Sequence, residues 1–158
     1  MRERSTFALV CITGFIAIVL TMIPLPFWLD TVRPAFLVLV VLYWCTMAPY
    51  SSGIALAFFP GLLLDVVQNS LLGEHALAMS LVGYLALRFH LIVRAKPLFE
   101  QCLFVFAGLL IYELVLWTID GWSDRGAVST ATRWVHTATG ALLWPLLVGL
   151  MGRFHTPQ

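Results

Sequence analysis

The sequence predicts an all-α integral membrane protein, built as one bundle of six membrane-spanning helices that covers residues 1–158. Composition is the first reason: 61% of the residues are hydrophobic and 11% are charged, whereas soluble domains contain about 25% charged residues. A chain of 158 residues has too little interior to hide so much apolar surface from water. The second reason is that six apolar runs follow one another with short connections and without a soluble domain.

Six segments come close to the length of a membrane-spanning helix, about 20 mostly apolar residues with about 17 as a practical minimum. The first follows a basic N-terminus and ends at Pro24 and Pro26. It is longer than the apolar run of a usual signal peptide and no A-x-A cleavage site follows it, so we expect a retained helix. The second begins with Pro34 in a helix-start position, ends before Pro49, and is short unless residues 27–32 lie in the interface. In chain order the expected spans are residues 7–23, 34–48, 52–68, 74–93, 98–119 and 132–151.

The distribution of Lys and Arg predicts that both termini lie in the cytoplasm. An even number of spans places both termini on one side of the membrane. That side would contain Arg2, Arg4, Arg88, Arg94, Lys96 and Arg153, and the outer side only Arg33, Arg125 and Arg133. Near the predicted outer boundary, an aromatic belt would be formed by Trp28, Trp117, Trp122 and Trp134.

No residue pattern points to catalysis, to a cofactor or to a metal. Cys11, Cys45 and Cys102 lie in apolar runs without C-x-x-C spacing, so we expect buried free thiols and no disulfide. The chain contains no G-x-S-x-G, H-E-x-x-H or P-loop motif, and no basic tract that would suggest nucleic-acid binding. The adjacent Tyr43 and Trp44 are interpreted as packing residues rather than as a ligand cage.

Several ionisable residues are expected at membrane depth, where they are expensive and usually face other helices or a cavity. The predicted topology places them near the outer ends of four spans, so we expect one structural polar cluster of Arg33, Asp65, Glu113, Arg133 and His136. In this hypothesis Arg33 or Arg133 neutralises Asp65 or Glu113. Two alternatives stay open: the arginines could simply reach the headgroups, or the acids could form a proton or ion relay. The inner halves of the spans offer no matching acids for a relay.

Small residues spaced four apart in residues 52–68 predict close packing against the next span. Each step of four turns about 40° around a helix, so the row forms a winding stripe, and small residues at this spacing let helix backbones approach. We expect a tightly packed hairpin of the third and fourth spans, with a direct ligand or partner contact as the alternative. The close-packing stripe consists of Gly53, Ala57, Gly61, Ala76 and Ser80.

The polar stretch between these two spans is expected to form the outer turn of the hairpin. Gly73 would make the turn, and Gln68 and Asn69 would meet the lipid headgroups. Glu74 and His75 would open the return helix as a solvated helix start.

Three motifs in order resemble the MreD family, the rod shape-determining membrane proteins of bacteria. The first is "VRPAFLVLVVLYWCTMAP", the second is "GLLLDVVQNSLLGEHALAMSLVGYL" and the third is "LLWPLLVGLMGRF". The resemblance covers nearly the whole chain, and each motif alone is short, whereas three in order are fairly specific. The matching positions are Arg33, Pro34, Tyr43, Trp44, Pro49, Gly61, Asp65, Gly73, Trp144 and Pro145.

The resemblance implies a non-enzymatic scaffold of the cell-elongation complex in the bacterial inner membrane, where it would help direct lateral peptidoglycan synthesis and rod shape. The implied partner is MreC, through its single membrane span, within a wider assembly of MreB filaments, RodZ, the RodA glycosyltransferase and a penicillin-binding transpeptidase. The family fold also resembles the membrane substrate-binding subunits of energy-coupling-factor transporters. That likeness suggests an alternative function: a small-molecule or lipid-binding subunit with a pocket near Asp65, Glu113 and Trp117.

Overall fold

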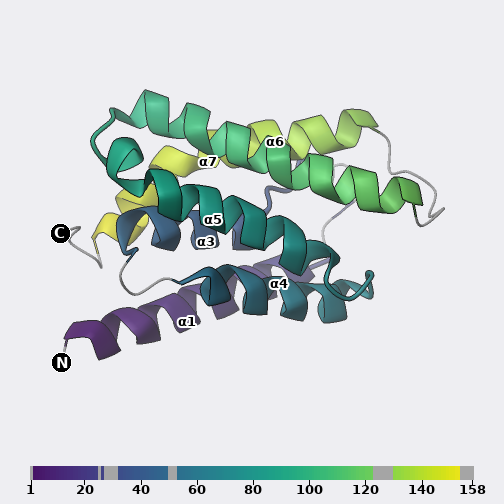
Figure 1. The fold of residues 1–158 in the computed structure, drawn as a ribbon, viewed down its shortest axis with the longest axis horizontal. Coiled ribbons are helices and arrows are strands. Elements are labelled where there is room, and N and C mark those ends of the chain that lie inside the picture. Colours follow the sequence, from purple (N-terminus) through teal and green to yellow (C-terminus); the bar gives the residue numbers. More distant parts are fainter. Residues whose placement is uncertain (1, 25, 27–31, 50–52, 123–129, 154–158) are drawn as a thin grey trace.

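The fold is known from a computed structural model, which describes residues 2–24, 26, 32–49, 53–122 and 130–153, with only the backbone at residues 2–5 and 130–133. These residues form six α-helices, shown in Figure 1, and the all-helical fold class expected from the sequence is confirmed. In chain order the helices are α1 (Arg2–Met22), α3 (Phe36–Met47), α4 (Ile54–Gln68), α5 (Glu74–Arg94), α6 (Leu98–Trp122) and α7 (Thr130–Gly152).

Three of the helices, α5, α6 and α7, are long and apolar enough to cross a bilayer. The apolar part of α1 (Thr6–Met22), α3 and α4 are shorter. The 12 residues of α3 extend over about 18 Å at 1.5 Å per residue, against about 30 Å for the hydrocarbon core. The six expected apolar segments are therefore helical, and length alone supports a membrane span for three of them.

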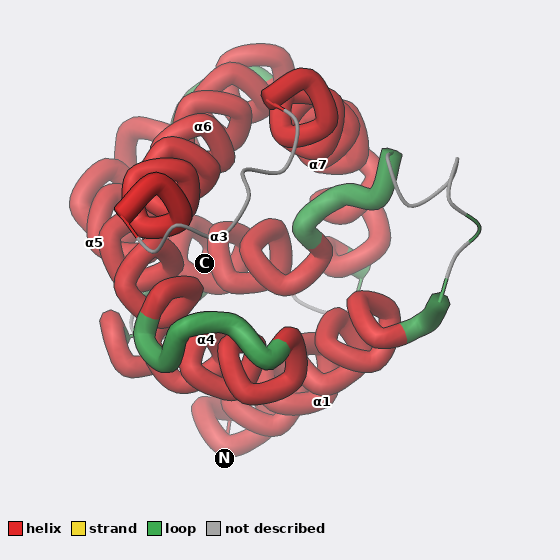
Figure 2. Tube along the Cα trace, turned by 90° about the vertical axis from the view of Figure 1, so that its right-hand side faces the viewer, coloured by secondary structure: helices red, strands yellow, loops and turns green. Residues whose placement is uncertain are grey.

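The short helix α3 lies in the middle of the bundle, as the end-on view in Figure 2 shows. It contacts all five other helices, and its residues from Leu37 to Leu39 and from Val41 to Met47 are buried. A helix that is hydrophobic all round is a buried helix, and "FLVLVVLYWCTM" contains one polar residue, Thr46. The Thr46 hydroxyl donates to the carbonyl of Leu42, 2.7 Å away within the same helix.

Two buried tryptophans, Trp44 and Trp144, connect α3 with its neighbouring helices through aromatic contacts and hydrogen bonds. Tyr43 lies edge-on to Trp44, with ring centroids 5.5 Å apart, and 6.3 Å from Trp144 of α7. A buried indole N–H usually needs an acceptor. Trp44 Nε1 donates to Thr13 Oγ1 of α1 at 3.0 Å, and Trp144 Nε1 donates to Gln101 Oε1 of α6 at 3.3 Å. These aromatic residues therefore connect α1, α3, α6 and α7 as packing residues.

The helices run back and forth between two ends of the bundle. The helix α1 begins and α7 ends at one end, called here the terminal end, which also includes the α5–α6 turn. The α4–α5 turn and the segment before α3 lie at the opposite end, called here the far end (Figure 1). Four basic residues belong to the last turns of α5, the α5–α6 turn and the end of α7, and therefore to the terminal part of the bundle: Arg88, Arg94, Lys96 and Arg153.

Candidate functional site

The α4–α5 turn at the far end contains two residues with left-handed backbone conformation. Asn69 follows α4 with φ of 53°, and Gly73 precedes α5 with φ of 100°. Such angles are open to glycine and tolerated by asparagine. They turn the chain back so sharply that the first turn of α5 lies beside the last turns of α4.

The carboxylate of Asp65 caps the start of α5 from the neighbouring helix. Its side chain is buried, with the residue 1% exposed. Oδ2 accepts a hydrogen bond from the Gly73 N–H at 2.8 Å, and Oδ1 accepts one from the His75 N–H at 2.8 Å. The first N–H groups of a helix have no partner within the helix, and a negative charge there interacts favourably with the helix dipole. Asp65 therefore fixes the geometry of the whole hairpin.

Two side chains complete this group, called here the capping cluster: Asp65, Ser70 and His75. His75 Nδ1 lies 2.8 Å from Asp65 Oδ1, and Ser70 Oγ donates to the same Oδ1 at 3.0 Å. Ser70 Oγ is 3.2 Å from His75 Nδ1 as well. In a nucleophilic triad the serine and the acid engage opposite ring nitrogens of the histidine. Here both engage Nδ1, so the arrangement orients a turn and does not activate the serine.

Asp65 does not pair with Arg33, so that expected ion pair is wrong. The expected pair with Arg133 stays a prediction, because the Arg133 side chain lies outside the described residues. The basic side chain beside Asp65 is His75, which arrives through the turn rather than from another span. The Arg33 guanidinium instead donates through Nη2 to the carbonyl of Leu20 near the end of α1. A cation at that position interacts favourably with the negative end of the helix dipole, so Arg33 caps α1.

Within the expected polar cluster, the structure brings Arg33 and His136 together. His136 Nδ1 forms a hydrogen bond with the Arg33 carbonyl, which ties the start of α7 to the segment before α3. Glu113 is half-buried in α6 and is not among the partners of Asp65. The side chain of Arg133 lies outside the described residues. Among the described residues, Asp65 therefore belongs to the capping cluster, and Arg33 and His136 form a separate contact.

Glu74 and His75 open α5 as expected, but they are buried rather than solvated. Asp120, in the last turn of α6, lies close enough to the Glu74 carboxylate to act on it electrostatically. The His75 ring lies 6.1 Å from the Tyr112 ring of α6. The start of α5 is therefore fastened to α6 as well as to α4.

The hairpin of α4 and α5 is packed closely at glycine and alanine positions. A Cβ at Gly61 would lie 2.5 Å from Ala76 Cα, so only glycine permits this approach. A Cβ at Gly83, outside the expected stripe, would lie 2.7 Å from the Ala57 side chain. Both alanines are fully buried. Backbone-to-backbone packing is thus centred on Gly61, where α4 and α5 meet.

The remaining two positions of the stripe, Ser80 and Gly53, have different surroundings. Ser80 is half-buried, and its hydroxyl donates to the carbonyl of Ala76 at 2.6 Å within α5. Gly53 is exposed at the N-cap of α4, where a Cβ would meet only the backbone nitrogen of Ala55 at 3.9 Å. The expectation of close packing at Gly53 is wrong, because the stripe begins one turn later.

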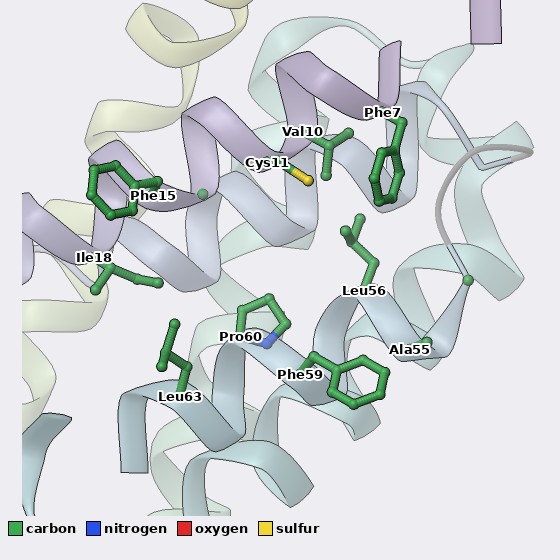
Figure 3. A pocket seen from close by; sticks show the side chains of 12 residues that line it. Phe7, Val10, Cys11, Phe15, Ile18, Ala55, Leu56, Phe59, Pro60 and Leu63 are labelled. Atoms are coloured by element: carbon green, nitrogen blue, oxygen red, sulfur yellow. The ribbon is translucent and has the colours of Figure 1, made fainter. Parts of the chain in front are cut away.

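A groove of about 580 Å³ lies between α1 and α4, with apolar side chains from both helices pointing toward it (Figure 3). Glu113, Trp117 and His136 are not among its lining residues, so this cavity is not the pocket suggested by the transporter analogy. Cys11 is exposed in this groove, contrary to the expectation that all three thiols are buried, whereas Cys45 is buried and Cys102 half-buried. Among the residues that the structure describes, no three His, Cys, Asp or Glu side chains form a metal site.

Comparison with known proteins agrees with the resemblance seen in the motifs. The sequence profile of the family described as "rod shape-determining protein MreD" matches residues 1–154. The rod shape-determining protein MreD of Haemophilus influenzae is 34% identical over 136 residues, which cover 86% of this chain and 83% of that protein. No solved structure matches the chain. Because the family profile extends over almost its entire length, this chain belongs to the MreD family of rod shape-determining proteins.

Proposed function

We propose that this protein is a non-enzymatic membrane scaffold of the complex that directs lateral peptidoglycan synthesis and rod shape, and that it binds the single membrane span of an MreC-type partner. Membership of the MreD family supports the role in rod shape. The observation that most favours a scaffold is the capping cluster. Asp65 and His75 are the best candidates for chemistry, yet they bind each other and the backbone of their own turn.

The proposed topology has six membrane helices in the bacterial inner membrane, with the terminal end in the cytoplasm. The basic residues Arg88, Arg94, Lys96 and Arg153 belong to the terminal part of the bundle, and positive residues favour the cytoplasmic side. The far end, with the capping cluster, then faces outward. Substituted-cysteine labelling of Arg153→Cys in intact cells tests this orientation: an impermeant thiol reagent should react only after permeabilisation. Labelling in intact cells would contradict it.

A chain with short connections between its helices can contact partners only through its membrane faces and its edges. A helix of an MreC-type protein would bind a membrane face by side-chain packing, as membrane helices associate. The other members of the assembly, the MreB filament, RodZ, the RodA glycosyltransferase and a penicillin-binding transpeptidase, would join through this partner or at the edges. Membrane lipid covers the remaining surface.

Purification of the full chain from its native membrane in mild detergent tests the proposal. An MreC-type single-span protein should co-purify, and an unrelated multi-span membrane protein of similar abundance serves as the control. Asp65→Ala should reduce the recovery of the partner, because the α4–α5 hairpin loses its geometry. Gln68→Ala, three residues later on the exposed face of α4, should not. Recovery of correctly folded wild-type protein without the partner would contradict the scaffold role.

A further inference from the structure

The groove between α1 and α4 is an apolar space that the chain itself leaves open. Its walls include Phe7, Phe15 and Ile18 of α1 and Phe59 and Leu63 of α4 (Figure 3). Phe15 is 67% exposed and Phe59 is 65% exposed. None of the lining residues is charged, so the groove offers hydrocarbon contacts and selects a hydrocarbon occupant.

The groove exists because the two helices that line it, α1 and α4, each pack against a different neighbouring helix. Thr13 of α1 accepts the hydrogen bond from Trp44 of α3, and Arg33 caps the end of α1. The helix α4 instead packs closely against α5 at Gly61. The contacts of α1 with α3 and of α4 with α5 hold α1 and α4 on either side of the groove.

The glycine at position 14 is not needed for close packing between the protein's own helices. It lines the groove, and a Cβ built on it would meet no heavy atom within 4 Å. Glycine inside a helix costs about 0.5–1 kcal/mol relative to alanine. At Gly61 this cost is offset by a helix contact, whereas at Gly14 the described residues provide none. The missing side chain leaves room for a molecule from outside the chain.

The extent of the groove matches one leaflet of a bilayer. Its lining on α1 runs from Phe7 to Ile18, which is about 18 Å at 1.5 Å per residue. Half of the hydrocarbon core is about 15 Å. On α4 the lining residues run from Ala55 to Leu63, in the first part of the helix. The groove therefore includes the middle of α1 and the terminal-end part of α4. It is shorter than the hydrocarbon core of about 30 Å, whereas a partner helix would need a surface over the full thickness.

The charge at the terminal end complements an anionic headgroup. Helix α1 begins with Arg2 and Arg4 in the turn before Phe7, where the groove starts. Arg88, Arg94, Lys96 and Arg153 belong to the same terminal part of the bundle, on α5, the α5–α6 turn and α7. Lys96 pairs there with Glu100 at 2.7 Å. Basic clusters at a membrane surface attract anionic lipids. A lipid whose acyl chain enters the groove would place its phosphate at this basic end.

We propose that the α1–α4 groove is a binding site for one acyl chain of an anionic phospholipid from the leaflet at the terminal end. The bound chain fills the space between Phe15 and Phe59 and packs α1 against α4. This inference does not depend on the scaffold role, because it concerns a lipid and not a protein partner.

Gly14→Leu is the decisive variant, because its side chain enters the groove without meeting another atom of the protein at its Cβ. Gly149→Leu is the matched control: a Cβ at Gly149 of α7 also meets nothing within 4 Å, but the residue is remote in the chain and does not line the groove. Each purified protein is incubated in detergent with equal amounts of phosphatidylglycerol and phosphatidylcholine with identical acyl chains. Native mass spectrometry then counts the lipids retained.

The wild type and Gly149→Leu should retain one phosphatidylglycerol in preference to phosphatidylcholine, and Gly14→Leu should retain it about tenfold less. Added phosphatidylglycerol should raise the unfolding temperature of the first two proteins only, because a ligand stabilises the state that binds it. It should also slow alkylation of Cys11 in the groove of the wild type. Equal retention by Gly14→Leu would overturn the site, and equal retention of both lipids would overturn its preference for anions. If Gly14→Leu no longer bound an MreC-type partner but still bound the lipid, the groove would be a binding site for a protein helix, and the proposal would be wrong.

Discussion

Replacing Asp65 with alanine should destabilise the protein more than any other single change at the far end. The carboxylate accepts hydrogen bonds from Ser70 Oγ and from the N–H groups of Gly73 and His75, and it pairs with His75 Nδ1. In Asp65→Ala these donors lose their acceptor, and the His75 N–H is left buried without one. The start of α5 then has no cap, and the hairpin that meets at Gly61 loses its fixed angle.

The magnitude follows from the number of groups left without a partner. A hydrogen bond to a charged acceptor contributes about 1.5–3 kcal/mol, and a buried donor without a partner costs about 1–3 kcal/mol. These values are not additive at one carboxylate. Breaking a buried hydrogen-bond network is among the most destabilising classes of mutation, and we expect Asp65→Ala to lower the free energy of unfolding by about 3 kcal/mol. Asp65→Asn keeps one oxygen but places an NH₂ group opposite a backbone N–H, so we expect about half the loss.

Equilibrium unfolding in mixed micelles, followed by far-UV circular dichroism against the fraction of denaturing detergent, measures these changes. Gln68→Ala is the control, because Gln68 lies on the same helix with an exposed side chain, and exposed substitutions usually change stability by less than about 0.5 kcal/mol. An Asp65→Ala protein as stable as Gln68→Ala would refute the capping argument. A loss in Asp65→Asn equal to that in Asp65→Ala would show that the charge, rather than the geometry, is what matters.

Two further predictions concern packing. Gly61→Ala should lower the free energy of unfolding by about 1–3 kcal/mol, because its Cβ would lie 2.5 Å from Ala76 Cα. Gly14→Ala is the control and should not destabilise the protein, because a Cβ there has open space around it. Equal stability of the two variants in the same assay would contradict the close approach of α4 and α5. Trp44→Phe should cost about 1–2 kcal/mol through the lost hydrogen bond to Thr13 and a small cavity. The double change with Thr13→Val should cost less than the sum of the single changes, and strict additivity would show that the bond does not stabilise the fold.

The helices could be predicted from the sequence because a membrane helix is encoded by the local run of apolar residues. The expected segments 74–93 and 98–119 correspond to α5 (Glu74–Arg94) and α6 (Leu98–Trp122). The central position of α3 was not predicted. Its apolar sequence would suit a lipid-facing helix and a fully buried helix equally well, and only the packing of the other five helices against it distinguishes the two.

The partner of Asp65 could not be predicted because it depends on the backbone of the turn. The topology suggested an arginine at similar depth, but depth says nothing about the direction in which a helix faces. The left-handed angles of Asn69 and Gly73 bring His75 back to a residue ten positions earlier. The available signal was an asparagine and a glycine separated by three residues, with an acid before them and a histidine after them.

By itself the sequence determined that the protein is helical and suited to a membrane, that a hairpin of α4 and α5 packs through small residues, and that the chain resembles the MreD family. These properties depend on composition, on spacing along one helix and on motifs, all of which are local. The tertiary structure decided that Asp65 caps α5 with His75, that Arg33 caps α1 and meets His136, and that a groove remains between α1 and α4. Each of these depends on the rotation of one helix about its axis relative to another, which is set by the sum of all packing contacts and not by any single segment.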